Sequence, residues 1–160
     1  GFALGTRAQM FSLNRGHPNS IAPGKRPRTT LTPTIVTANG LPVMSFGTPG
    51  GDQQDQWSLQ FFLNFVEFKM NLQQAIDAPT FHTSHFPSSF YPRDAHPGRI
   101  HLENRFSHHV LNGLRKRGHK IVLEDAWSNG RVTAVHFNNA TRVMSAAASP
   151  RFETPYALGW

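Results

Sequence analysis

A helical segment that is apolar on almost every side constrains this 160-residue chain more than any other feature. From about 54 to 68, apolar residues recur at the helical spacing i, i+3, i+4, i+7, and aromatic residues flank them: Leu59, Phe62, Leu63 and Val66, with Trp57, Phe61, Phe65 and Phe68. A helix of this composition must be covered on most of its surface. The sequence therefore predicts a helix that is largely buried in a core.

A tight turn, Pro49-Gly50-Gly51, comes immediately before this helix. Two adjacent glycines leave backbone N–H groups unshielded by side chains, and the positive end of a helix dipole strengthens their pull on an anion. The turn could thus form an anion or oxyanion cradle, or its glycines could simply supply positive φ angles. The chain has no GxGxxG or GxxxxGK[ST] pattern, which disfavours nucleotide binding.

The other elements are marked by turn and capping residues. Asn39-Gly40 predicts a β-hairpin over 34–46, and Asn71 with Gln74 forms a capping box before a helix over 72–78 that ends at Pro79. We further expect a long loop, a helix, a strand and a second hairpin, over 80–98, 104–117, 119–123 and 132–147. Because strands and helices do not alternate strictly, this order predicts a single α+β domain, an antiparallel sheet with helices on one side.

Composition excludes some classes of function and leaves others open. There is no cysteine, which rules out disulfides and thiolate nucleophiles, and no stretch of about 18 apolar residues that would predict a membrane span. Residues 1–11 lack the pattern of a signal peptide, and both the bacterial cytoplasm and the periplasm remain open. The balance of 16 Lys and Arg against 9 Asp and Glu would suit a phosphate backbone, an anionic surface or an acidic substrate.

Two other groups of residues could form sites. His82, His85, His96 and His101, with Asp94 or Glu103, could be offered as metal ligands, but no HExxH pattern is present and we expect no metal. Arg115, Lys116 and Arg117 with His119 could contact nucleic acid. Cations at the end of a helix explain the same residues, so we expect no nucleic-acid partner.

Several segments, in this order, resemble the small subunit of the gamma-glutamyltranspeptidase family. They are 22–27 (APGKRP), 29–36 (TTLTPTIV), 47–51 (GTPGG), 70–79 (MNLQQAIDAP) with Phe81-His82, 117–119 (RGH) and 149–151 (SPR). The resemblance implies an N-terminal-nucleophile hydrolase with an αββα sandwich, made by self-cleavage of a precursor into two subunits. In such enzymes an N-terminal threonine attacks a gamma-glutamyl amide, with its own α-amine serving as the base.

The resemblance also implies what this chain lacks. Gly1 has no side chain, and every threonine is internal, so residues 1–160 correspond to the C-terminal portion of the small subunit without its nucleophile segment. We expect the large subunit and the missing N-terminal segment of the same precursor as partners. The chain alone is expected to be inactive, and the chemistry requires no cofactor.

Site residues carry over from the family position by position. Gly50 and Gly51 match the glycine pair whose amides form the oxyanion hole, and Thr29 and Thr30 stand where two serines bind the substrate carboxylate. The alternative for the threonines is that two β-forming residues begin a strand.

Two segments depart from the family pattern. The family's Asn-Asn-Glu/Gln-Met-Asp-Asp segment, which holds the substrate's α-amino group, is replaced by 5–10 (GTRAQM), so that Met10 stands in the acidic position and Arg7 would repel an ammonium group. After the glycines, 52–56 (DQQDQ) replaces the usual Ser-Arg-Ile. Both changes point toward the acylase-like relatives, and we assign Arg7 to substrate binding.

These observations predict part of an N-terminal-nucleophile amidohydrolase or acyltransferase that acts on gamma-glutamyl or related small-molecule amides. A glutaryl- or cephalosporin-type acylase subunit is one alternative. A non-catalytic binding subunit and a basic module for acidic polymers are the others.

Overall fold

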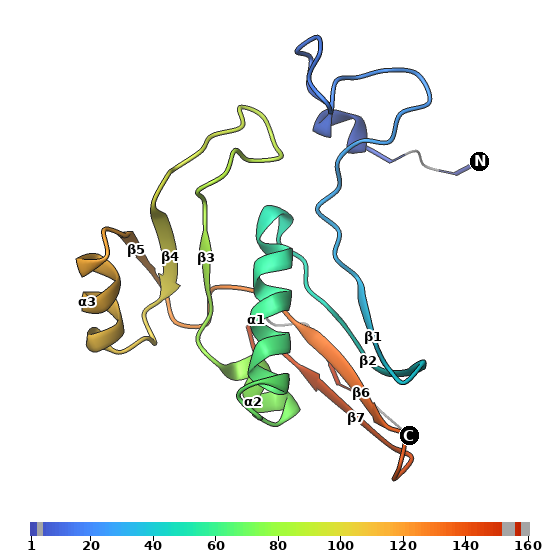
Figure 1. Ribbon diagram of the computed structural model, residues 1–160, viewed down its shortest axis with the longest axis vertical. Helices are drawn as coiled ribbons and strands as arrows, with labels where there is room; N and C mark the ends of the chain where they lie inside the picture. The colour runs from blue at the N-terminus through green and yellow to red at the C-terminus, as the bar shows by residue number, and fades with distance from the viewer. Residues whose placement is uncertain (3–4, 152–155, 158–160) are drawn as a thin grey trace.

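The computed structural model describes residues 1–2, 5–151 and 156–157. Two sheets and three α-helices make up this part of the chain (Figure 1). The helices are α1 (Gln54–Val66), α2 (Leu72–Asp77) and α3 (His108–Lys116). The strands are β1 (Thr34–Ala38), β2 (Leu41–Gly47), β3 (Phe81–Thr83), β4 (Arg99–Glu103), β5 (Lys120–Glu124), β6 (Thr133–Asn138) and β7 (Val143–Ala148).

The first sheet is antiparallel, in the order β1-β2-β6-β7. Both predicted hairpins are confirmed, and β2 pairs with β6 to join them, with Met44 opposite His136. Helices α1 and α2 lie on one face of this sheet, where Phe46 packs edge-on against Phe61 with 5.0 Å between ring centroids. The prediction of an antiparallel sheet with helices on one side holds for this half of the molecule.

Helix α1 is present where the sequence predicts it, but a different face is buried. The buried residues are Gln54, Trp57, Ser58 and Phe61, which keep the i, i+3, i+4, i+7 spacing on another side of the helix. Leu59 is 57% exposed and Leu63 38% exposed, so the helix is not covered on most of its surface by the described residues, as the sequence predicted it would be. A helix that is apolar all round does not reveal from its period which side faces the sheet.

A second sheet, in the order β3-β4-β5, differs from the sequence prediction. Strand β3 lies within the segment expected to be a loop, and β4 was not predicted. Strands β4 and β5 are parallel and are joined through α3, so the protein is not wholly antiparallel. Ile100, Leu102 and Leu111 form a separate small core between this sheet and α3.

Helix α3 begins at His108, four residues later than predicted. Residues 104–106 form a turn in which the Asn104 N–H donates to the Glu124 carbonyl (2.9 Å). The Ser107 hydroxyl then accepts from the Val110 N–H as the N-cap. The capping box of Asn71 and Gln74 at the start of α2 is confirmed. No helix in the described part of the chain is long and apolar enough to cross a membrane.

Two glutamines of α1 pair with the edge of β3 as a neighbouring strand would. The Gln56 amide accepts from the Thr83 N–H (2.8 Å) and donates to the Thr83 carbonyl (3.1 Å). Gln60, one turn later, makes the same two bonds with Phe81 at 3.1 and 2.7 Å. Residues i, i+4 on a helix and i, i+2 on a strand are about equally spaced, at roughly 6 Å. The pair therefore attaches the second sheet to α1.

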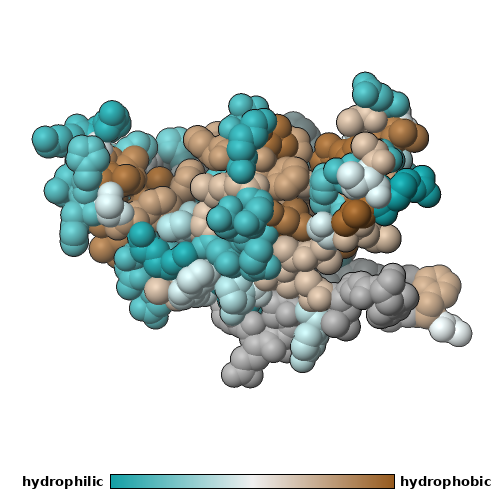
Figure 2. Space-filling view, turned by 90° about the horizontal axis from the view of Figure 1, so that it is seen from below, coloured by the Kyte–Doolittle hydropathy of each residue, from teal (hydrophilic) through white to brown (hydrophobic). Residues whose placement is uncertain are grey.

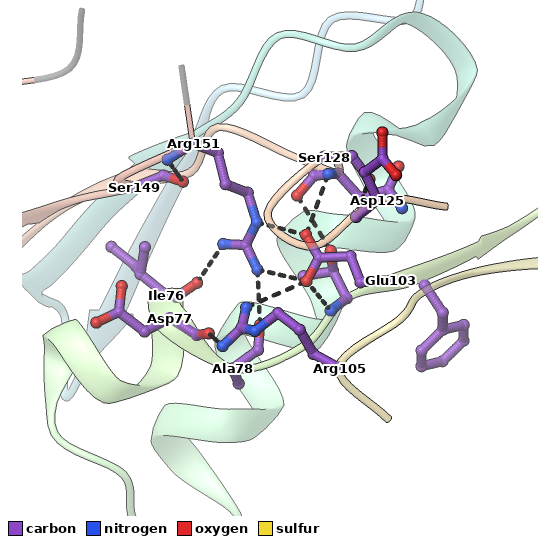
Figure 3. A network of polar contacts seen from close by, with 12 residues as sticks. Ile76, Asp77, Ala78, Glu103, Arg105, Asp125, Ser128, Ser149 and Arg151 are labelled. Carbon is purple, nitrogen blue, oxygen red and sulfur yellow. Dashed lines mark hydrogen bonds and ion pairs between the residues drawn. The ribbon is translucent and has the colours of Figure 1, made fainter. Parts of the chain in front are cut away.

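A buried carboxylate holds the two halves of the molecule together (Figure 3). Glu103 has no exposed surface, and it accepts from Arg151 Nε (2.7 Å) and Nη2 (3.0 Å) and from Arg105 Nη1 (3.2 Å). It also accepts from the Thr80 and Asn129 N–H groups, at 3.2 and 3.1 Å. Burial alone would raise the pKa of Glu103, but the hydrogen bonds and the charge of Arg151 outweigh it and hold the pKa below the ordinary 4.5.

We predict that Glu103→Gln destabilises the full-length protein at pH 7 by about 3 to 5 kcal/mol, because it leaves the Arg151 guanidinium buried and unpaired. A carboxyl whose pKa is lowered by folding contributes stability above its unfolded pKa and loses it as pH falls through the folded pKa. The difference in melting temperature between wild type and variant should therefore narrow below about pH 4.5. Glu67→Gln, at an exposed carboxylate, is the control. An equal melting temperature for Glu103→Gln and wild type at pH 7 would contradict the assignment.

Candidate functional site

The glycine turn lies between β2 and the start of α1, and its backbone has positive φ at both glycines. Gly50 has φ +141° and Gly51 has φ +62°. A Cβ atom on Gly50 would lie 2.2 Å from Cζ3 of the buried Trp57, so no side chain fits there. The expectation that the glycines supply positive φ angles is confirmed, and the role of the turn as an anion cradle stays a prediction.

The Gly50 backbone borders a cavity of about 160 Å³ that is lined by Pro49, Gly50, Trp57, Ser128, Gly130 and Arg131. Within the described residues, the Gly50 N–H has no hydrogen-bond acceptor. An unpaired donor at a cavity beside the first turn leading into a helix is suited to an oxyanion.

Gly51 differs from the expectation of an unpaired amide. The side-chain amide of the buried Gln54 has its nitrogen toward two carbonyls, of Thr30 at 3.1 Å and of Thr48 at 2.9 Å. In this orientation, which its neighbours require, its oxygen accepts from the Gly51 N–H at 3.2 Å. Gln54 therefore ties the glycine turn to the segments that enter β1 and leave β2.

Asp52 connects the glycine turn to the segment 84–98. Its carboxylate accepts from the Ser88 hydroxyl (3.2 Å), from the Ser89 N–H (2.7 Å) and from the Ser89 hydroxyl. The Arg93 guanidinium in the same segment donates to the Ser89 carbonyl at 2.9 Å. The residues that depart from the family pattern after the glycines thus hold this segment in place.

Arg93 also reaches the N-terminal part of the chain. It donates to the carbonyls of Met10 (3.2 Å) and Phe11 (2.8 Å), and the Asn19 side chain donates to the Met10 carbonyl as well (2.6 Å). We call this chain of contacts, Asp52 to Ser88 and Ser89 to Arg93 to Met10 and Phe11, the polar brace. It links the glycine turn to the segment that carries Arg7.

Arg7 and Met10 lie in a short 3₁₀ helix, Arg7–Met10. Met10 is fully buried and Arg7 is partly exposed. Met10 therefore acts as an anchor for this segment, and it places an apolar side chain where the family's acidic residue was expected.

Thr29 and Thr30 lie before β1, which begins only at Thr34, so the alternative that they start a strand is wrong. The exposed Thr29 hydroxyl accepts from the Leu31 N–H (3.2 Å). Thr30 is buried, and its carbonyl accepts from the Gln54 amide. Through Gln54, Thr30 is connected to the glycine turn.

The structure brings together two of the four histidines that were weighed as metal ligands. The rings of His82 and His101 stack at 4.5 Å between centroids, and His101 Nδ1 lies 2.9 Å from Glu124 Oε1. His85 Nδ1 instead accepts from the Gly98 N–H, and Glu103 is engaged by Arg151. Glu124, which the sequence analysis did not consider, completes a cluster in which one donor atom from each residue lies within 4.8 Å of the others.

The basic residues at the end of α3 lie where a helix C-terminus favours cations, as expected. Arg117 Nη1 donates to the Gly113 carbonyl at 2.9 Å.

Arg151, in the segment 149–151 that resembles the family, is 2% exposed and belongs to the Glu103 network, so its side chain is occupied within the core.

Sequence reasoning missed Gln54, Asp52 and Arg93 as parts of the site. The available signal for Asp52 and Gln54 was their departure from the family pattern directly after the glycines. Arg93 had no local signal, because its partners lie 82 and 83 residues away in the chain.

Comparison with known proteins places the chain in a family. The family model for gamma-glutamyltranspeptidase matches residues 1–158. A glutathione hydrolase proenzyme of Pseudomonas sp. strain A14 is 46% identical over 80 residues, covering 50% of this chain and 14% of the relative. The Acylase ACY 1 proenzyme of Pseudomonas sp. strain V22 is 30% identical over 148 residues, covering 92% of this chain and 24% of the relative.

A solved structure has the same fold as this chain over its whole length. The structure of LmbA2991HD superposes with a TM-score of 0.92 at 52% identity, covering all of this chain and 28% of the matched chain. The chain thus spans about a quarter or less of the curated proenzymes with which it is compared here. On the match to the family model over nearly its whole length, this chain belongs to the gamma-glutamyltranspeptidase family of self-processing N-terminal-nucleophile hydrolases.

Proposed function

We propose that this chain supplies the oxyanion hole and substrate contacts of an N-terminal-nucleophile amidohydrolase that cleaves gamma-glutamyl or related dicarboxylic amides. The observation that carries the proposal is the Gly50 N–H, which has no acceptor among the described residues and belongs to a residue that borders a cavity before α1. A donor in this position would stabilise the negative charge that builds on a carbonyl oxygen during nucleophilic attack. The Gly51 N–H would be a second donor if the substrate oxygen displaces or shares the Gln54 contact.

The nucleophile and the rest of the fold would come from other parts of the precursor. Helices α1 and α2 cover one face of the first sheet, whereas Ile35 and Val135, which point to its other face, are 72% and 41% exposed. Figure 2 shows apolar residues reaching the surface between hydrophilic ones on the face viewed from below. We propose that a second sheet from the precursor packs on the open face and completes an αββα sandwich, and that the attacking threonine lies in that remainder.

The acyl group that fits best carries a carboxylate and no α-amino group. Met10 is buried in the position of the family's acidic residue, and the segment 7–13 contains no Asp or Glu but does contain Arg7. An ammonium group would therefore meet no paired carboxylate there, whereas Arg7, Thr29 and Thr30 would suit a carboxylate. The similarity to an acylase over 92% of the chain supports this glutaryl-type alternative.

Two anilides that differ only in the α-amino group test this assignment. The processed full-length enzyme should hydrolyse glutaryl p-nitroanilide with a kcat/KM at least about tenfold above that for gamma-glutamyl p-nitroanilide, roughly the 1.4 kcal/mol of one unpaired charge contact. Arg7→Ala should reduce this ratio, and Arg15→Ala, at an exposed site, should leave it unchanged. A preference for the gamma-glutamyl compound would overturn the glutaryl assignment, and no hydrolysis of either would overturn the amidohydrolase.

Gly50→Ala tests the oxyanion assignment. The added Cβ would displace either Trp57 or the turn, and with it the Gly50 amide. We expect kcat to fall by about 100-fold to 1000-fold with a much smaller change in KM. Gly118→Ala, at φ +87° with open space around it, carries similar backbone strain far from the turn and should keep its activity.

A normal kcat in correctly folded Gly50→Ala would remove Gly50 from the reaction. If this variant does not fold, Gly51→Ala is the second test, because its Cβ would lie 3.3 Å from the Phe90 ring and needs a smaller adjustment.

Arg93→Met tests whether the polar brace positions the N-terminal segment for substrate binding. The change removes the hydrogen bonds to Met10, Phe11 and Ser89, each made by a charged donor. We expect KM for glutaryl p-nitroanilide to rise about tenfold while kcat falls much less, because the glycine turn is retained. Arg15→Met, which removes a positive charge from an exposed position, is the control and should leave KM unchanged. An unchanged KM in Arg93→Met would show that the brace has no part in binding.

A further inference from the structure

The three strands of the second sheet bring two imidazoles and a carboxylate together. His82 on β3 is the cross-strand partner of His101 on β4, and Glu124 lies on the adjoining β5. One donor atom from each side chain lies within 4.8 Å of the other two. We propose that His82, His101 and Glu124 form a binding site for a divalent transition-metal ion of the zinc class.

The chemistry of the donors selects the class of metal. Two imidazole nitrogens and one carboxylate oxygen are the borderline donors that Zn²⁺ and Co²⁺ accept, whereas Ca²⁺ and Mg²⁺ prefer sites made of oxygen alone. Three protein ligands leave a fourth tetrahedral position for water. The Ser84 hydroxyl lies 3.3 Å from His101 Nε2, the ring nitrogen that does not face Glu124, and can hold the ring in position for coordination through Nδ1.

His82 supplies the independent observation that points to a ligand. Its side chain is buried, with 8% of the residue exposed, and its Nδ1 has no hydrogen-bond partner in the described part of the chain. A buried ring nitrogen without a hydrogen-bond partner is a polar atom that a bound ion would satisfy.

Metal binding would replace an interaction that is already present. His101 Nδ1 and Glu124 Oε1 are 2.9 Å apart, and coordination of an ion by both atoms would replace this direct hydrogen bond. Bonds of about 2.0 Å to a tetrahedral ion bring donor atoms to roughly 3.3 Å from one another, so the two rings must turn out of their stacked arrangement. The side chains of His101 and Glu124 are 18% and 28% exposed, which leaves a route for the ion to enter.

The site would act on structure, because it crosslinks all three strands of a sheet that has only a small core of its own. Its position also connects it to the glycine turn. The His82 ring lies edge-on to Trp57, with 5.5 Å between centroids, and Trp57 is the side chain that fills the space beside Gly50. Metal binding at this site does not depend on the hydrolytic reaction proposed above.

The test uses processed full-length enzyme stripped with a chelator and measures binding without turnover. Titration with Co²⁺ should give the visible absorption of a tetrahedral complex at one ion per chain, and Zn²⁺ should displace it. His82→Gln and His101→Gln should each weaken Co²⁺ affinity by at least roughly 10- to 100-fold. His109→Gln, which removes an exposed histidine of α3, is the matched control and should bind as the wild type does.

A second measurement separates metal binding from a merely structural role of the histidines. Zn²⁺ should raise the melting temperature of the wild type and of His109→Gln, but not that of His101→Gln or of Glu124→Gln. Co²⁺ binding that is equal in wild type, His82→Gln and His101→Gln would overturn the proposal. The proposal would also be overturned if 100 µM Co²⁺ or Zn²⁺ did not bind to the wild type.

Discussion

The ion pair between Glu103 and Arg151 is the interaction on which the rest of the structure depends. The two apolar clusters do not merge: one lies between the first sheet and helices α1 and α2, and the other between the second sheet and α3. The carboxylate on β4 and the guanidinium that follows β7 connect these halves. Arg151 also donates to the Ile76 and Ala78 carbonyls, at 2.8 and 2.9 Å, at the end of α2. Because each of these groups is buried, the loss of any one would leave charge or polar atoms unpaired.

Helix α1 connects both sheets to the glycine turn of the candidate site. Phe61 fixes the helix against the first sheet, and Gln56 and Gln60 fix the second sheet against the helix. The glycine turn is continuous with the first turn of α1, so its position follows from both contacts. The turn is therefore held by elements of both sheets, which is the rigidity that the proposed oxyanion donor would need.

Local patterns in the sequence were enough to predict the local structure. Asn39-Gly40 specified a hairpin, and Asn71 with Gln74 specified a helix start, because each signal acts within four residues. The strand Arg99–Glu103 was missed because its sequence, RIHLE, mixes charged and apolar residues over only five positions. Its parallel pairing with β5, and the pairing of Glu103 with Arg151 across 48 residues, are long-range contacts that no local pattern records.

The difference between local patterns and long-range contacts also explains which parts of the candidate site could be predicted. The position of the glycine turn before α1 was predicted because its residues are adjacent in the chain, and its role as a site stays a prediction. The role of Gln54 could not be predicted, because its partners Thr30 and Thr48 lie before and after a hairpin and are distant from it in the sequence. From the sequence, its segment could be recognised only as a departure from the family pattern. The histidine cluster could not be separated from the other loop histidines, because the strands that align His82 with His101 were not predicted.

The polar brace suggests how one family can serve several substrates. The brace holds the N-terminal segment almost entirely through backbone carbonyls, those of Met10 and Phe11, so its strength does not depend on the side chains that the segment carries. A change at Arg7 would therefore leave intact the contacts of Asp52 and Arg93 that join this segment to the glycine turn. Chemistry and selectivity would then reside on separate pieces of chain held at a fixed distance. Such a separation fits a family whose members include both glutathione hydrolases and acylases.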